Sequence, residues 1–194
     1  MIVGILADTH IVDDSGISEL QHSVIQAFQG ADAILHLGDL GTSTKALDDL
    51  EAIAPLSATL GGHNPEDDRV TETKKVVNAG DVRIGMVFDL ETLGLEFEFI
   101  HDHDSPNSHR LEFAPDIDIP SVLESQFGQR VDVVAFAATH ASYFGSHQGV
   151  QFINPGSPTI PEPGAKPGGV VKRTIAFLDI EGASINPRTS EVEA

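Results

Sequence analysis

Asp8 and His10 stand two residues apart where a short apolar run ends, in the stretch GILADTH that begins at Gly4. A carboxylate and an imidazole together suit hard and borderline divalent ions such as Mn²⁺. Aspartate is also an ordinary turn residue, so this pair alone fits either a metal site or a turn. The other candidate ligands decide between the two interpretations.

Further aspartate and histidine residues occupy the same place in the pattern, directly after an apolar run. They are Asp39 after ILHLG, His63 after ATLGG, His101 and His103 around the end of FEFI, and His140 with Thr139 after FAA. In an open α/β sheet the carboxyl ends of the strands converge on one edge, where ligands bind. Five segments far apart in the chain would thus deliver aspartate or histidine to one rim, which favours a site over five unrelated turns.

Metal-assisted hydrolysis is the chemistry that fits this pattern. Two divalent ions about 3.5–4 Å apart can clamp a phosphate, lower the pKa of a bound water and stabilise the attacking and leaving oxygens. A carboxylate can bridge both ions because it has two oxygens, and Asp39 is the natural candidate for that bridge. The chain has no cysteine, so oxygen and imidazole groups must hold any metal.

Composition limits the class of protein. The chain has 194 residues, 40% of them hydrophobic, which is enough for one folded domain. Its 30 acidic and 11 basic residues give a formal charge of −19, so we expect no nucleic acid and no membrane as partner. This charge favours a small phosphorylated substrate, and it fits either an ordinary acidic protein or one from a high-salt cell. With no basic leader and no apolar run near the roughly 20 residues of a membrane span, we expect a cytoplasmic location.

Apolar runs closed by turn residues alternate with helical patterns, which is typical of α/β proteins. The predicted strands cover residues 2–7, 33–37, 57–60, 82–88, 95–100, 131–136, 150–153 and 174–180. Helical spacing and capping signals predict helices over residues 17–29, 43–53 and about 119–127. The first third therefore alternates strand and helix, which favours parallel strands.

The rest of the chain has other signals. Gly80 and Asp81 separate two β-rich runs and predict a hairpin. Residues 154–169 are rich in proline and glycine and predict a loop before the last strand. We expect a single domain over residues 1–185 and a polar, frayed tail over residues 186–194.

The order of the motifs resembles that of the calcineurin-like metallophosphoesterases. The motifs are Asp8-Thr9-His10, Gly38-Asp39, Gly61-Gly62-His63-Asn64, His101-Asp102-His103, Thr139-His140 and Asn154-Pro155-Gly156-Ser157. Within that family the chain is most similar to the small single-domain group of YfcE-type phosphodiesterases and the retromer scaffold subunit. The resemblance implies a four-layer α/β/β/α sandwich of two mixed β-sheets flanked by helices, with a metal site at one rim.

The resemblance also implies roles for individual residues. It implies a complete first metal shell of Asp8, His10, Asp39 and His140. Asp39 matches the bridging carboxylate, which is a catalytic role, and His101 matches a histidine ligand of the second ion. It further implies a divalent metal cofactor, Mn²⁺ first and Fe, Zn, Ni or Mg as alternatives, with one or two ions bound.

Two departures from the family pattern remove expected ligands of the second ion. Gly62 stands where the family has an asparagine ligand, and Ala138 stands where it has a histidine. Asp102 replaces a glycine of the family and is a candidate substitute ligand, with Asn64 or His103 as possible helpers. Binding of the second ion is therefore an open question at this stage.

Three other features have two interpretations each. His63 matches a histidine that donates a proton to the leaving oxygen in larger relatives, or it is a loop histidine beside two glycines. His36 is in phase with its strand, so we expect a packing residue rather than a ligand. The residues from Asn154 to Ser157 are an ordinary tight turn after a strand, or, as the resemblance implies, a turn that braces the metal-binding loops from behind.

The sequence thus predicts a metal-dependent phosphoesterase, more specifically a phosphodiesterase. One alternative is a non-catalytic binding module of the same fold, which Gly62 and Ala138 favour. Another is a one-metal hydrolase of a non-phosphate ester. Arg110, Arg130 and Lys172 are scattered candidates for a phosphate clamp, and a homodimer is a possible assembly.

Overall fold

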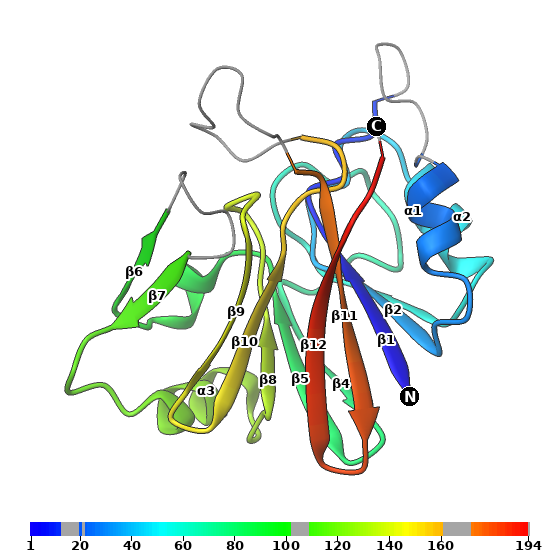
Figure 1. Cartoon of the computed structure of the whole chain (residues 1–194). Helices are drawn as coiled ribbons and strands as arrows, with labels where there is room; N and C mark the ends of the chain where they lie inside the picture. Colours follow the sequence, from blue (N-terminus) through cyan, green and yellow to red (C-terminus); the bar gives the residue numbers. More distant parts are fainter. Residues whose placement is uncertain (13–19, 21, 102–108, 161–171, 194) are drawn as a thin grey trace.

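The structure is a computed structural model that describes residues 1–12, 20, 22–101, 109–160 and 172–193. Two large sheets lie face to face, with helices outside each of them (Figure 1). The strands are β1 (Ile2–Leu6), β2 (Ala33–His36), β3 (Leu56–Ala58), β4 (Lys74–Ala79), β5 (Val82–Val87), β6 (Phe97–Ile100), β7 (Arg110–Phe113), β8 (Val133–Ala135), β9 (Ser142–His147), β10 (Val150–Pro155), β11 (Thr174–Glu181) and β12 (Ser184–Glu191). The helices are α1 (His22–Ala27), α2 (Lys45–Glu51), the 3-10 helix η1 (Leu90–Leu93) and α3 (Ile119–Phe127).

The first sheet has the strand order β12-β11-β1-β2-β3. Strands β1, β2 and β3 are parallel, as the alternation of strand and helix predicts, and β11 and β12 add antiparallel strands on the other side of β1. The carboxyl ends of β1 and β2 therefore lie at one rim, at the end of β1 opposite the N-terminus (Figure 1).

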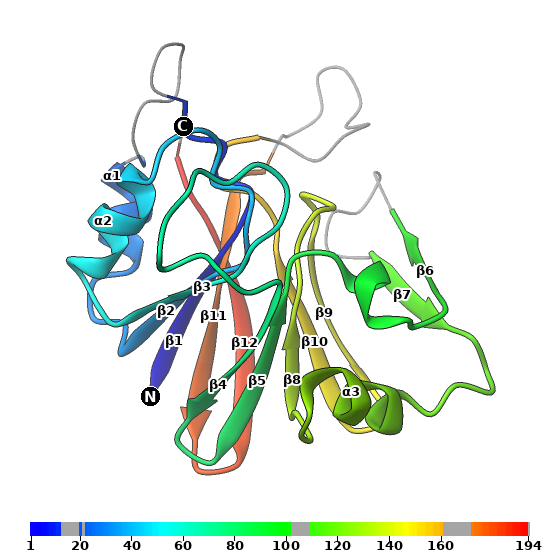
Figure 2. The same ribbon diagram turned by 180° about the vertical axis from the view of Figure 1, so that it is seen from behind.

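The second sheet has the order β4-β5-β8-β10-β9. Strands β5, β8 and β10 are parallel, whereas β4 and β9 are antiparallel edge strands. The predicted hairpin between β4 and β5 is confirmed, and Gly80 in its turn has a φ of +62°. Strands β6 and β7 form a separate two-stranded sheet on the side of α3, away from α1 and α2 (Figure 2).

Alternating side chains of the two sheets build the central core. In β1, Val3 and Ile5 point between the sheets, and they meet side chains such as Ile84 and Val133 of the second sheet. Because neighbouring residues of a strand face opposite sides, Leu6 packs instead against the helices outside the first sheet. The two sheets and their outer helices make four layers, which confirms the predicted fold class.

The helices cover the outer faces. Helix α2 packs against the first sheet through Leu47 and Leu50, and α3 covers the second sheet through Ile119 and Leu123. Helix α3 has the predicted boundaries. Asp118 caps its first turn, because its side chain accepts a hydrogen bond from the Ser121 amide. Part of the helix predicted over residues 17–29 is α1, while residues 13–19 and 21 lie outside the described ones. None of the described helices is long and apolar enough to cross a membrane.

The predicted C-terminal tail is wrong in its main part, because residues 184–191 form the edge strand β12, paired along its whole length with β11. Its polar side chains face solvent, and Pro187 is tolerated because one side of an edge strand needs no ladder hydrogen bonds. Arg188 stacks over Phe177 at 3.9 Å and pairs with Asp179 at 3.1 Å. An exposed polar strand of this kind has the composition of a loop, which explains the error.

Candidate metal centre

The candidate ligands lie on three loops at the carboxyl ends of parallel strands. Asp8 and His10 follow β1, Asp39 follows β2, and His140 follows β8. The first two loops run side by side, since the Asp8 amide donates to the Gly38 carbonyl at 3.0 Å and the His10 amide to the Asp39 carbonyl at 3.2 Å. The topology therefore brings residues 130 positions apart to one rim, as the sequence predicts.

Three of the predicted ligands converge. Asp8, His10 and His140 each offer a donor atom, and these atoms lie within 4.8 Å of one another. The Nε2 atoms of His10 and His140 are 3.3 Å apart, and His140 Nε2 is 3.6 Å from Asp8 Oδ1. Two imidazole nitrogens at this separation fit a single ion, because tetrahedral nitrogen ligands about 2.0–2.1 Å from a metal lie at a similar distance from each other.

Asp8 has the environment of a ligand rather than of a structural carboxylate. Its side chain is fully buried, and neither of its carboxylate oxygens accepts a hydrogen bond from the residues that the structure describes. Burial raises the pKa of Asp8, and the nearby His140 opposes this rise. A buried carboxylate without hydrogen-bond donors is costly unless a cation compensates it. The residues present therefore fit a divalent ion.

The backbone at these residues is strained. Asp8, His10, Asp39 and His140 have φ values of 52°, 46°, 53° and 56°, in the left-handed region. Left-handed geometry costs a residue with a side chain about 1–2 kcal/mol, although aspartate and histidine adopt it more often than most. Strained residues cluster at functional sites, where the surrounding structure holds them in place. Four of the six described non-glycine residues with positive φ are thus the residues that the resemblance assigns to the first metal shell.

Asp39 belongs to the centre but not to the group of three convergent ligands. Its Oδ1 lies 3.5 Å from His10 Nδ1 and accepts the His63 amide at 3.3 Å. The side chain is nearly buried, with 7% of the residue exposed. The structure thus places the predicted bridging carboxylate beside His10.

The predicted ligands of a second ion, Asp39 and His101, do not belong to the convergent group of the described residues. His101 lies outside the convergent group, with its ring against Phe99 at 4.9 Å and His109 at 5.8 Å between centroids. Gly62 and Ala138 have no ligand to offer. Asp102 and His103 lie outside the described residues, so their predicted roles stay predictions, as does that of His101.

The loop after β3 contributes backbone contacts to the centre. The side chain of His63 is exposed, while its amide donates to Asp39 and its carbonyl accepts the Gly41 amide at 2.9 Å. The Asn64 side chain donates to the Gly61 carbonyl at 2.5 Å and accepts the Leu40 amide at 3.4 Å. Asn64 therefore holds the loops together here instead of facing an ion.

The turn after β10 braces the centre, as predicted. Ser157 and Thr159 donate hydroxyl hydrogen bonds to the Asp8 carbonyl, at 2.8 Å and 3.0 Å. Asn154 donates to the Ala137 carbonyl at 3.2 Å and to the Thr139 hydroxyl at 3.1 Å. Sequence reasoning missed Thr159, although a hydroxyl residue two positions after Ser157 was a usable signal.

His36 and Thr9 form a second brace. His36 is fully buried, and its Nδ1 accepts the Gly38 amide at 3.2 Å, so its Nε2 carries the proton and donates to the Thr9 hydroxyl at 3.1 Å. Burial lowers the pKa of His36 to about 3, so the ring is neutral at physiological pH. The prediction of a packing residue is confirmed, and the ring also links the two loops that carry Asp8 and Asp39.

The predicted phosphate-clamp residues are each engaged elsewhere. Arg130 pairs with Glu124 at 3.4 Å, Arg110 approaches Glu112 at 3.6 Å, and Lys172 pairs with Glu191. Each of the three cations thus has an acidic partner, and its role in a phosphate clamp stays a prediction.

Sequence comparisons support the family that the motifs resemble. The model of the calcineurin-like phosphoesterase superfamily domain matches residues 1–182. A protein of Methanothermobacter thermautotrophicus described as "Probable metallophosphoesterase" is 29% identical over 161 residues, which cover 83% of this chain and 79% of that protein. A protein of Methanocaldococcus jannaschii with the same description is 28% identical over 83% of this chain and 70% of its own length.

Solved structures share the fold. Vps29 of Entamoeba histolytica complexed with Zn²⁺ has a TM-score of 0.63 at 18% identity, and the match covers 98% of this chain and 99% of that one. A predicted phosphoesterase of Streptococcus pneumoniae has a TM-score of 0.57 at 13% identity, over 98% and 88% of the two chains. Since the family model covers nearly the whole chain, this protein belongs to the calcineurin-like phosphoesterase superfamily.

Proposed function

We propose that this protein is a divalent-metal-dependent phosphoesterase that hydrolyses a small phosphodiester. The observation that carries the proposal is the convergence of Asp8, His10 and His140 around a buried carboxylate that no hydrogen bond of the described residues satisfies. Membership of the phosphoesterase superfamily supports hydrolysis of a phosphoester as the reaction class.

Different residues would bind the metal and donate the proton. Asp8, His10 and His140 would hold the ion, which when bound polarises the phosphoryl group and lowers the pKa of a coordinated water. His63 would donate a proton to the leaving oxygen, because its exposed ring is anchored by its own amide to Asp39 beside the centre. The strained loops keep these groups in place before the substrate arrives, so little reorganisation is needed.

The donor set and the charge narrow the metal and the substrate. Two imidazoles and one carboxylate suit Mn²⁺ first, and also Fe²⁺ or Zn²⁺. The net charge of −19 repels polyanions, so the substrate of the proposal is a small phosphorylated molecule rather than a nucleic acid.

The test is hydrolysis of bis(4-nitrophenyl) phosphate by metal-stripped protein, with and without added Mn²⁺, in low and high salt. We expect activity that requires the metal and that falls by at least 100-fold in His140→Ala. His22→Ala is the matched control, because His22 is exposed on α1. Activity that persists in His140→Ala, or in the absence of any metal, would contradict the proposal.

A non-catalytic binding module is the second candidate function. Gly62 and Ala138, at two expected ligand positions, are the observation that favours it. Metal binding without hydrolysis of any phosphodiester, phosphomonoester or carboxylic ester would support this candidate over the first.

A further inference from the structure

We infer that Asp39 positions His10 instead of bridging two ions, and that the centre holds one ion per chain. The inference rests on the proposed metal centre but not on its catalytic activity. It assigns Asp39 a role different from the one that the family resemblance implies.

The orientation of His10 is the first argument. Its Nε2 faces His140 Nε2 at 3.3 Å, while its Nδ1 faces Asp39 Oδ1 at 3.5 Å. A histidine that binds a metal through one ring nitrogen usually gives its other N–H to a carboxylate, which fixes the tautomer and makes the ligand more basic. Asp39 has the place of that carboxylate.

The surroundings of Asp39 are the second argument. Its Oδ1 also accepts the His63 amide at 3.3 Å. Its Oδ2 lies beside Gly62, so close that a Cβ on residue 62 would overlap the carboxylate. Each oxygen therefore has a protein neighbour, and neither belongs to the convergent set of donor atoms.

The lack of further convergent ligands among the described residues is the third argument. Gly62 has a φ of +61°, and both its backbone geometry and the nearby Asp39 carboxylate oppose a side chain at this position. Ala138 is a second position without a donor. Among the described residues, Asp8, His10 and His140 form the single group of three metal-ligating side chains.

The first experiment counts ions. Metal-stripped protein is titrated with Mn²⁺ by calorimetry, and the bound metal is measured after dialysis. We expect one ion per chain in the unaltered protein and in Asp39→Asn, with an affinity 10–100-fold weaker in the variant. Two ions per chain, or an affinity in Asp39→Asn that is unchanged or lost altogether, would overturn the inference.

The second experiment needs no variant, so it does not depend on the folding of Asp39→Asn. Long-range ¹H–¹⁵N spectra of the Zn²⁺-loaded protein report the state of each histidine nitrogen. We expect coordination of His10 through Nε2 and a proton on Nδ1, whereas coordination through Nδ1 would overturn the inference. One bound ion without hydrolysis would sink the proposed function alone, and hydrolysis with two bound ions would sink this inference alone.

Discussion

The hydroxyl of Ser157 donates a 2.8 Å hydrogen bond to the carbonyl oxygen of Asp8, although 149 residues separate them. Thr159 adds a second hydroxyl to the same carbonyl at 3.0 Å. Two buried donors on one carbonyl fix the backbone of Asp8 in its strained, left-handed conformation. The position of the buried carboxylate thus depends on a turn 149 residues further along the chain.

Ser157→Ala should weaken both the fold and the metal centre. The change removes one donor to Asp8 and leaves the Thr159 and Ile160 amides without their acceptor, which costs about 1–3 kcal/mol in the free energy of unfolding. Metal affinity should fall about 10–100-fold. Urea unfolding and Mn²⁺ titration measure the two effects. Ser146→Ala, on an exposed position of β9, should change neither quantity.

Gly62→Ala should destabilise the protein more than Gly80→Ala. The two glycines have φ values of 61° and 62°. Each alanine variant therefore loses about 1–2 kcal/mol because its backbone is in the left-handed region. A Cβ at residue 62 meets the Asp39 carboxylate, while one at residue 80 meets nothing within 4 Å. We expect an extra loss of about 1–3 kcal/mol and weaker metal binding in Gly62→Ala alone. Equal losses in the two variants would show that Asp39 can move away freely.

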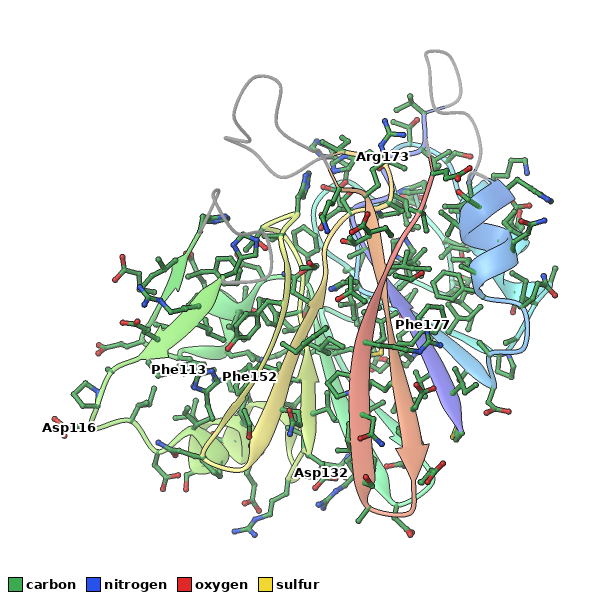
Figure 3. The ribbon with its side chains drawn as sticks, viewed as in Figure 1. Phe113, Asp116, Asp132, Phe152, Arg173 and Phe177 are labelled. Atoms are coloured by element: carbon green, nitrogen blue, oxygen red, sulfur yellow. The ribbon has the colours of Figure 1, made fainter. Side chains whose placement is uncertain are left out.

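Asp8→Asn should stabilise the metal-free protein while it abolishes metal binding. Burial raises the pKa of Asp8, so the carboxylate form is penalised at neutral pH when no cation is bound. We expect the free energy of unfolding in a chelator at pH 7.5 to rise by roughly 0.5–2 kcal/mol. Thermal unfolding with chelator and with Mn²⁺ checks both parts. Asp116→Asn, which points into solvent (Figure 3), should leave both curves unchanged.

His36 should make the protein less stable in acid. Its pKa is about 3 in the folded protein and about 6.5 in an unfolded chain, so the unfolded chain binds an extra proton between these values. The free energy of unfolding should therefore fall as the pH is lowered from 6.5 to 3, by at most about 1.4 kcal/mol per pH unit from this group. His36→Gln should flatten the profile measured by urea unfolding, whereas His22→Gln on exposed α1 should keep the original slope.

Ala138→Gly should stabilise the protein. Ala138 has a φ of 70° and an exposed side chain, so it has backbone strain but no packing to lose. Ala52→Gly is the control, because Ala52 is also exposed and has a φ of −66°. The free energies of unfolding of the two variants should differ by about 1–2 kcal/mol in favour of Ala138→Gly. Similar losses in both would mean that residue 138 is not strained in solution.

The sequence predicted the candidate ligands well where each of them directly follows a buried apolar strand. Asp8, His10 and His140 could be placed at one rim because each follows a buried apolar run, and the structure brings them together. The exposed strand β12 could not be predicted, since its polar residues and Pro187 have the composition of a loop. The contact between Asp39 and His10 was also out of reach, because it depends on side-chain orientation and on the backbone position of Gly62.

The central place of β1 in its sheet has a consequence for how the protein is made. Strand β1 pairs with β2 on one side and with β11, from residues 174–181, on the other. A nascent chain on the ribosome cannot pair β1 on both sides until β11 has emerged, and such long-range pairing forms slowly. Asp8 is translated early but gains His140 and the Ser157 hydroxyl late. Metal capture therefore waits for the synthesis of residues 140–157, and translation products that end before these residues would lack it.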